Sequence, residues 1–340
     1  MRAWVMRRKG RRRREWRRMA IHHASFLLDV DGAEGDVSAA LVRRRLERGD
    51  FFWLDLHDPS PEQLDLLRDP FGLHPLAVED AEHFGQRPKL EVFDDFVFLV
   101  AYGAGGRHGA LVEVHCFLSG RWLITVHRTD CPAFEELRRA TVEGRAPAPG
   151  PALALHRVVD ALADSFFPEL ARLDDQIDRL EDGVLREPDE KQLQQVFRLK
   201  RRLVQWRKVI TPERDLFARL AAGVVEIPGM TSDVERYYRD VYDHLIRISD
   251  LVDSYRDLLT GAMDVYLSTV SNRLNEIMKR LTIVATVFLP LMFIVGFFGM
   301  NFGWMVRHMT GFWPFFWLAL VAEVAIVLVM LLWFRRRRWI

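Results

Sequence analysis

The chain has 340 residues, and 48 lysines and arginines face 47 aspartates and glutamates, which gives a formal net charge of +1. This balance argues against bulk attraction to nucleic acid, and the length predicts more than one domain. The two cysteines, Cys116 and Cys131, form no metal-spaced set with histidine, and we expect no disulfide in a cytoplasmic part.

Residues 1–20 form a basic block with nine arginines and lysines between Arg7 and Arg18. Like charges repel one another, so this tail is predicted to be disordered. The basic block has three explanations: it is attracted to anionic lipid, it is a solvated tail, or the start codon has been placed too early. We favour the last two. No apolar stretch follows the charges, which argues against a signal peptide.

Residues 21–150 are predicted to form a cytoplasmic α/β domain. Short alternating or apolar runs predict strands at residues 25–30, 51–56, 96–102, 112–118 and 122–127. A helix is predicted at residues 61–68, after a cap at Ser60. The proline-rich segment 146–151 ends the domain.

Residues 151–280 are predicted to form a helical hairpin and a long stalk helix. Helices are expected at 152–185 and 190–222, and a third begins near Ser232 and continues into an apolar stretch. That third helix would have about seventy residues and a length on the order of 100 Å. A helix of this kind needs packing partners, which indicates a stalk within an oligomer.

Two apolar stretches near the C-terminus predict membrane spans. Residues 281–298 lack any charge, and residues 312–334 hold only Glu323, close to the length that crosses a bilayer. A buried hairpin of two core helices is the less common alternative. We therefore predict a first transmembrane helix at 281–300, an external loop at 301–311, a second transmembrane helix at 312–334 and a basic tail at 335–340.

The basic residues predict the orientation of these spans. Lys279 and Arg280 precede the first span and four arginines follow the second, whereas the loop holds only Arg307 and His308. The bias toward basic residues on the cytoplasmic side places both termini in the cytoplasm. The chain is thus expected to be a multi-pass protein of the inner cell membrane, in contact with lipid.

Several motifs together resemble the CorA family of divalent-cation channels, the magnesium and cobalt transporters. They are Gly-Met-Asn at 299–301, the segment 271–282 before it, and upstream segments at 74–80, 86–91 and 239–244. The resemblance covers about residues 50–340. It implies an α+β membrane protein that assembles with itself into a homopentameric funnel, with Mg²⁺ or Co²⁺ carried through five copies of the first span.

The chain departs from the family pattern in three places. The external loop carries no acid where the family has Met-Pro-Glu-Leu, Phe298 stands where a tyrosine is usual, and Glu323 lies inside the second span. These departures bear on the outer ring that attracts cations and on the ion preference.

Gly299, Met300 and Asn301 are the expected selectivity mouth. Magnesium sheds its water reluctantly, so a mouth can bind the hydrated ion. The Asn301 carbonyl oxygen accepts hydrogen bonds from such waters without trapping the ion. Gly299 allows the helix end to turn. A plain helix stop and turn is the alternative, which the flanking motifs disfavour.

Below the mouth, a set of residues at steps of three and four shares one helix face. The resemblance makes this the pore face, with a polar ring and a hydrophobic constriction that gates by dewetting. Periodicity alone is equally typical of ordinary helix packing. The set is Asn275, Met278, Leu281, Ala285, Leu289 and Met292.

The resemblance also implies regulatory Mg²⁺ binding by Glu79, Asp80, Asp160 and Asp240, between subunits. Carboxylates facing each other across an interface repel, and a bound Mg²⁺ would hold the interface shut. Each could also be a solvated surface acid.

Two rival functions stay open: a zinc transporter of the ZntB type, and a membrane-anchored cytoplasmic sensor that conducts nothing. We find no His-Glu-x-x-His set, phosphate-binding glycine loop or nucleophile elbow, so no enzyme activity is expected.

Overall fold

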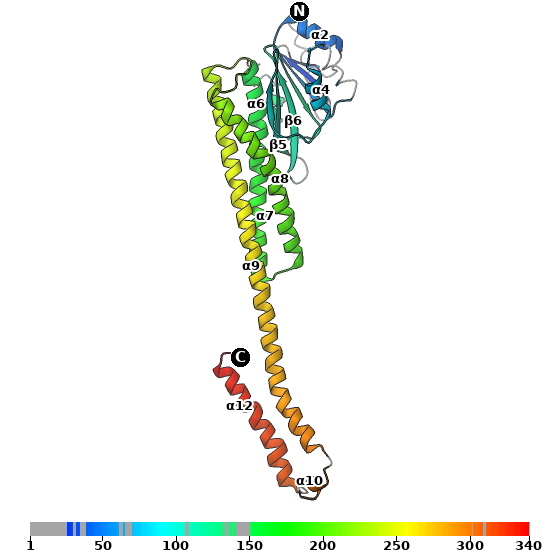
Figure 1. Cartoon of the computed structure of the whole chain (residues 1–340), viewed down its shortest axis with the longest axis vertical. Helices are drawn as coiled ribbons and strands as arrows, with labels where there is room; N and C mark the ends of the chain where they lie inside the picture. The colour runs from blue at the N-terminus through cyan, green and yellow to red at the C-terminus, as the bar shows by residue number, and fades with distance from the viewer. Residues whose placement is uncertain are drawn as a thin grey trace, which may run out of the picture. The chain divides into compact units, whose positions relative to one another are not determined.

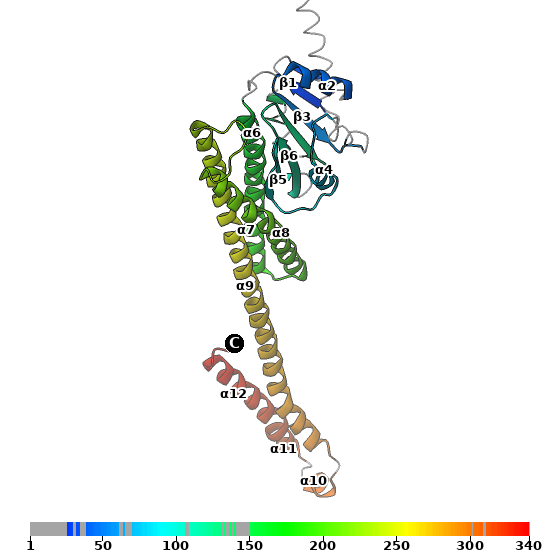
Figure 2. The same cartoon turned by 45° about the horizontal axis from the view of Figure 1, so that its top comes forward.

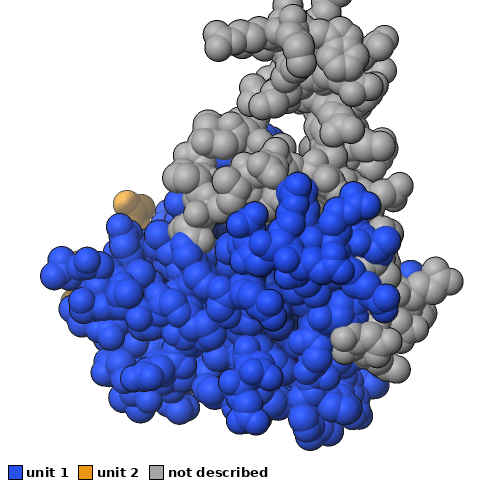
Figure 3. Space-filling view, turned by 90° about the horizontal axis from the view of Figure 1, so that it is seen from above, with its two compact units in different colours: residues 1–182, 191–261 blue, residues 183–190, 262–340 orange. Residues whose placement is uncertain are grey.

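The computed structural model describes residues 26–29, 32–34, 39–60, 64, 70–105, 109–130, 132, 136–137, 139–140, 150–300, 302–308 and 311–339. The basic tail and most of the helix predicted at 61–68 lie outside these residues. The chain forms two compact units, residues 1–182 with 191–261, and residues 183–190 with 262–340, drawn in blue and orange in Figure 3.

A seven-stranded mixed sheet forms the centre of the first unit. Its order is β2-β1-β3-β7-β6-β5-β4, and β3 and β7 are its parallel pair. The five predicted strands are present, whereas the short β2 and β4 were not predicted. The strands are β1 Phe26–Asp29, β2 Gly32–Glu34, β3 Phe52–His57, β4 Lys89–Val92, β5 Val97–Gly105, β6 Ala110–Leu118 and β7 Trp122–His127.

Helices cover this sheet and extend away from it. The helix α6 packs against β5, β6 and β7, as Figures 1 and 2 both show. The strands β3, β5 and β7 are buried along their whole length. The sequence of β5 is accordingly an apolar run, whereas β3 and β7 also bury Asp55, His57, Thr125 and His127. The helices here are α2 Ala39–Arg48, α4 Pro75–Glu82, α6 Pro151–Asp164, α7 Phe166–Arg186, α8 Glu190–Ala221 and the first part of α9 Ser232–Phe298.

The single helix predicted at 152–185 is wrong, because Ser165 separates α6 from α7. The Ser165 hydroxyl donates to Leu162 O at 2.5 Å and accepts from the Ala104 backbone N–H at 2.7 Å. The second bond links the helix junction to β5. Pro168 then lies in the first turn of α7, where a missing backbone N–H costs nothing.

Two buried polar contacts tie α8 to the sheet. Glu213 Oε1 accepts from the Tyr102 backbone N–H at 3.0 Å, and Trp206 Nε1 donates to Gly109 O at 3.1 Å. Both side chains are almost completely buried. Buried polar groups need partners, so these contacts fix where α8 lies on the sheet.

The second unit holds the apolar C-terminal part of the chain. The predicted third helix is confirmed as α9, with 67 residues. The predicted external loop contains a short helix, α10 Gly303–His308. The predicted second span is not one uniform helix: α11 Phe312–Pro314, the π-helix η1 Phe315–Val321 and α12 Ala322–Arg336 follow one another.

Candidate functional site

The end of α9 is an apolar helix that its own chain leaves uncovered. Of the described residues, an 18-residue window in this helix is apolar enough to cross a membrane, and none of that window is buried within the chain. Water disfavours such a surface, so lipid, other protein or both must cover it.

This part of α9 has two different faces. The predicted pore face is exposed: Met278, Leu281, Leu289 and Met292 are 59%, 62%, 71% and 68% accessible, and Asn275 and Ala285 are exposed too. The partly covered positions recur at steps of three and four on another face. They are Lys279, Ile283, Val287, Pro290, Leu291, Ile294 and Phe298.

The partly covered face meets the C-terminal segment. Lys279 Nζ donates to Arg338 O at 3.2 Å, which joins the start of the apolar part of α9 to the residues just beyond α12. This bond is made on the partly covered side of α9, whereas the predicted pore side is exposed within one chain.

The helix ends at the Gly-Met-Asn motif. The Gly299 N–H donates to Val295 O at 2.9 Å, and the Met300 N–H donates to Phe297 O at 3.3 Å. A Cβ at position 299 would lie 2.9 Å from Val295 O, closer than real Cβ atoms come, so a larger residue would displace the turn. Asn301 lies outside the described residues.

A cluster of ionisable side chains forms where α6 meets α9. Asp160, Asp164 and His244 each offer a ligand atom, and these atoms lie within 4.8 Å of one another. His244 Nδ1 is 3.1 Å from Asp164 Oδ1 and 3.9 Å from Asp160 Oδ1, while His244 Nε2 is 3.9 Å from Asp240 Oδ2. The structure thus brings two predicted regulatory residues, Asp160 and Asp240, to one histidine.

The cluster is short of positive charge. Burial, and then the neighbouring carboxylates of Asp164 and Asp240, raise the pKa of Asp160 to about 6, although His244 opposes the rise. Asp160 Oδ1 and His244 Nδ1 are buried and have no hydrogen-bond partner among the described residues, since the 3.1 Å approach of Asp164 lacks hydrogen-bond geometry. Oxygen and imidazole ligands with unused lone pairs are suited to a divalent cation.

Glu79 and Asp80, the other two predicted regulatory residues, lie on α4 and are not part of this cluster. Lys89 Nζ donates to Asp80 Oδ2 at 2.5 Å and to Glu91 Oε1 at 3.0 Å, so Asp80 already has a cationic partner. The Glu79 side chain is exposed. Within the described part of a single chain, the predicted set of four is therefore not assembled.

Asp164 and His244 were missed as site residues, although the sequence held a signal for them. Asp160 and Asp164 are four residues apart on one predicted helix, and Asp240 and His244 are four apart on another. Residues at this spacing share a helix face. Which two faces meet was not visible from the sequence, because it depends on how α6 and α9 pack.

The chain was compared with known proteins. A family described as "CorA-like Mg2+ transporter protein" matches residues 48–336. The chain is 37% identical over 278 residues to the cobalt/magnesium transport protein CorA of Thermotoga maritima, covering 79% of this chain and 78% of that protein. It is 23% identical over 330 residues to the zinc transport protein ZntB of Yersinia pseudotuberculosis, covering 96% and 99%.

The fold also matches a solved structure. The complete CorA magnesium transporter of Methanocaldococcus jannaschii superimposes with a TM-score of 0.80 at 24% identity, over 93% of this chain and 99% of that one. The family match covers most of the chain and agrees with the mixed sheet, the long apolar helix and the Gly-Met-Asn end described above. The chain belongs to the CorA-like family of divalent metal ion transporters.

Proposed function

We propose that the protein is a homopentameric Mg²⁺ channel of the inner membrane that also carries Co²⁺, with both termini in the cytoplasm. The uncovered face of α9 is the observation that carries this proposal. It runs from Asn275 to Met292 and ends about two turns below Gly299. Five copies of α9 around an axis would bury this face and line a path for ions. Gly299, Met300 and Asn301 would form the mouth of that path.

Such a path has the physical properties that conduction of a hydrated cation needs. Met278, Leu281 and Leu289 would form a constriction that blocks ions when it is dry. Asn275 and Asn301 would give polar rings at its two ends, and their amide oxygens accept hydrogen bonds from the water shell of the ion.

Regulation by cytoplasmic Mg²⁺ is the second part of the proposal. The residues that would hold the ion are Asp160, Asp164 and His244, with Asp240 at the edge and with Glu79 and Asp80 from a neighbouring subunit. The orphaned Asp160 oxygen and the surplus of carboxylates support this assignment. A site filled at about five times its Kd contributes roughly 1 kcal/mol. Five sites would contribute about 5 kcal/mol, enough to move a two-state gate.

Zinc transport is the second candidate function. His244 puts an imidazole into the cluster, and imidazole is a better ligand for zinc or cobalt than for magnesium. The acid-free external loop and the similarity to ZntB point the same way.

Ion flux into liposomes that contain the purified protein tests the proposal and separates the candidates. We expect Mg²⁺ uptake that Co²⁺ inhibits by competition and that Zn²⁺ affects only weakly. Uptake of Zn²⁺ that excess Mg²⁺ does not reduce would favour the zinc function. Liposomes that take up neither ion would favour a membrane-anchored sensor.

A further inference from the structure

A large cleft in the first unit has seven cationic side chains in its lining. It lies between α8 and the sheet, and its volume is about 1240 Å³. The described lining includes one carboxylate, Glu113. The cations are Arg87, Arg128, Arg198, Arg201, Arg202, Arg207 and Lys208. The whole chain has a net charge of only +1, so positive charge is concentrated locally in this concave surface.

The one acid in the cleft is engaged in holding its wall. Glu113 accepts hydrogen bonds from the Gly85 N–H at 2.5 Å and the Gln86 N–H at 3.1 Å, and it contacts His115 Nε2 at 2.8 Å. The Tyr102 hydroxyl donates to Gln86 O. These bonds fix the loop that carries Arg87, so this wall is organised before any ligand binds.

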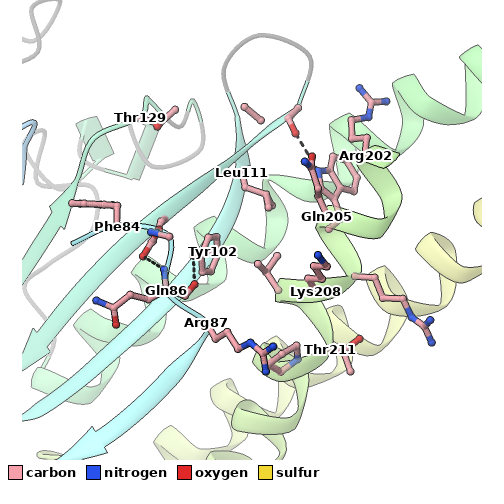
Figure 4. Close-up of a pocket in the computed structure, with 18 of the residues that line it drawn as sticks. Phe84, Gln86, Arg87, Tyr102, Leu111, Thr129, Arg202, Gln205, Lys208 and Thr211 are labelled. Carbon is pink, nitrogen blue, oxygen red and sulfur yellow. Dashed lines mark hydrogen bonds between the residues drawn. The ribbon is translucent and has the colours of Figure 1, made fainter. Parts of the chain in front are cut away.

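Three of the cations are also engaged, one of which is Arg202, 5.6 Å from the centre of the Trp206 ring. Arg207 pairs with Asp253 at 3.2 Å, and the Arg128 guanidinium lies 4.5 Å from the centre of the Phe84 ring. Arg87, Arg198, Arg201 and Lys208 form no ion pair with any residue that the structure describes. Figure 4 shows Arg87 reaching from the sheet side toward α8, where Lys208 and Thr211 lie.

The α8 cations recur at helical spacing and share the face that lines the cleft. Arg198, Arg201 and Arg202 are three and four residues apart, and Lys208 follows two turns after Arg201. Like charges held together repel unless an anion neutralises them. Arginine forks bind phosphate oxygens in pairs, and a lysine adds a mobile point charge.

The rings in the cleft are already covered. Phe84 stacks on His115 at 4.5 Å on one side and faces Arg128, while Trp206 is buried beneath Arg202. They offer no free face for a nucleobase. A ligand would therefore be recognised by its phosphates. Because the cations are spread along α8, a ligand with neighbouring negative charges would match them.

We propose that this cleft binds a polyphosphate, either free or as the phosphate tail of a nucleotide. The anion would bridge Arg87 on the sheet side and Arg198, Arg201 and Lys208 on α8. This site is separate from the cation cluster at Asp160 and His244, and the proposal does not rest on magnesium transport.

Calorimetric titration of the full chain in detergent tests the proposal, with tripolyphosphate as the probe. Divalent ions are removed beforehand with EDTA, so that chelation of a bound metal cannot produce the signal. We expect saturable binding that weakens as salt rises. Arg201→Gln and Lys208→Gln should each weaken it about tenfold, the loss expected for one charge-assisted contact.

Arg219→Gln is the matched control, because Arg219 is exposed on the same helix but does not line the cleft. It removes the same charge and should leave binding unchanged. Arg201→Lys should lose less than Arg201→Gln, and circular dichroism checks that each variant is folded. ATP should bind within about threefold of tripolyphosphate, whereas adenosine should not bind.

Three results would overturn the proposal. The first is no saturable binding of tripolyphosphate at low salt. The second is a loss in Arg219→Gln as large as that in Arg201→Gln. The third is binding of adenosine as tight as that of ATP, because the site would then recognise the base and not the phosphates.

Discussion

Individual buried side chains decide much of how the first unit holds together. Glu213 is the clearest case, because it is an acid buried completely between α8 and the sheet. Burial raises its pKa from 4.5 to about 8, although the hydrogen bond from the Tyr102 N–H opposes the rise. The carboxyl of the folded protein therefore stays protonated at neutral pH. Cys116 on β6 and Asp55 on β3 are other titratable groups on the strands of this core.

The raised pKa of Glu213 predicts a pH dependence of stability. The folded protein holds a proton that the unfolded chain releases above pH 4.5, so this contribution is complete below pH 4.5 and is lost as pH rises through about 8. Glu213→Gln keeps the acceptor oxygen and cannot ionise. We expect it to raise the free energy of unfolding at pH 8.5 by on the order of 1 kcal/mol, or roughly 2–4 °C in Tm, with no gain at pH 5.

Thermal unfolding of the two proteins across this pH range measures the effect. Asp215→Asn is the control, since Asp215 is an exposed acid on the same helix. An equal fall of Tm with pH in the wild type and in Glu213→Gln would contradict the prediction.

Asn301 is the residue on which the proposed ion selection depends. Replacing it by alanine removes the amide oxygen that would bind the hydrated ion, so Asn301→Ala should abolish Mg²⁺ flux while assembly is unchanged. Flux into liposomes and size-exclusion chromatography give the two readouts. Normal transport by this variant would show that the mouth has been placed wrongly.

At the scale of helices and strands, the junction between α6 and α7 is the point where the helices attach to the sheet. Gly103 on β5 approaches it closely: an added Cβ would lie 2.8 Å from Ser165 Oγ and 2.9 Å from Leu162 Cδ2. Neither neighbour can move aside easily, because the Leu162 side chain is buried and Ser165 is bonded on both sides.

Gly103→Ala should therefore destabilise the first unit by about 1–3 kcal/mol, the usual cost of overpacking. Denaturant unfolding measures this cost. Gly120→Ala is the control, because a Cβ there meets nothing within 4 Å. A Gly103→Ala protein as stable as Gly120→Ala would mean that α6 moves away from β5 at little cost.

The same junction shows what sequence reasoning reached and what it missed. Long apolar or periodic runs predicted the strands β3, β5, β6 and β7 and the start of α9 because each buries one continuous surface. The break at Ser165 was missed because it depends on a bond to Ala104, far away in sequence. Pro168 was an available signal, since a proline inside a helical pattern often ends the helix before it. The strand β2 has three residues, too few for a periodicity to appear, and β4 has two charged residues among its four.

The candidate site was predictable to a similar extent. The exposed face from Asn275 to Met292 followed from spacing and family resemblance, whereas Asp164 and His244 required the packing of α6 on α9. The contact of Asp80 with Lys89 likewise depends on the loop that leads from α4 to β4.

For the whole molecule, we propose that other copies of the chain cover the open face of α9. We expect native mass measurement in mild detergent to give five copies of the 39.7 kDa chain. A stable monomer or dimer would contradict the pentamer, and with it a pore lined by this face.

The proposed regulation by Mg²⁺ also concerns the whole molecule, and proteolysis can test it. Asp240→Lys puts a fixed positive charge beside His244, where it would replace that of the ion. Protease resistance of this variant should no longer depend on added Mg²⁺, whereas the wild type should become more resistant. Digestion that still slows sharply in millimolar Mg²⁺ would exclude Asp240 as the regulatory site, and the acidic hairpin between Asp174 and Glu190 would become the better candidate.

The parallel pairing of β3 with β7 has a consequence for how the protein is made. The sheet cannot close until β7 has been synthesised, because Phe52–His57 pairs with Trp122–His127. The apolar stretch that begins at Leu281 leaves the ribosome roughly 150 residues later, which at about 5–20 residues per second is a delay of roughly 8–30 s. The sheet therefore has time to fold before that apolar stretch emerges. A substitution that slows the pairing of β3 with β7 would leave the domain incompletely folded when the apolar stretch reaches the insertion machinery.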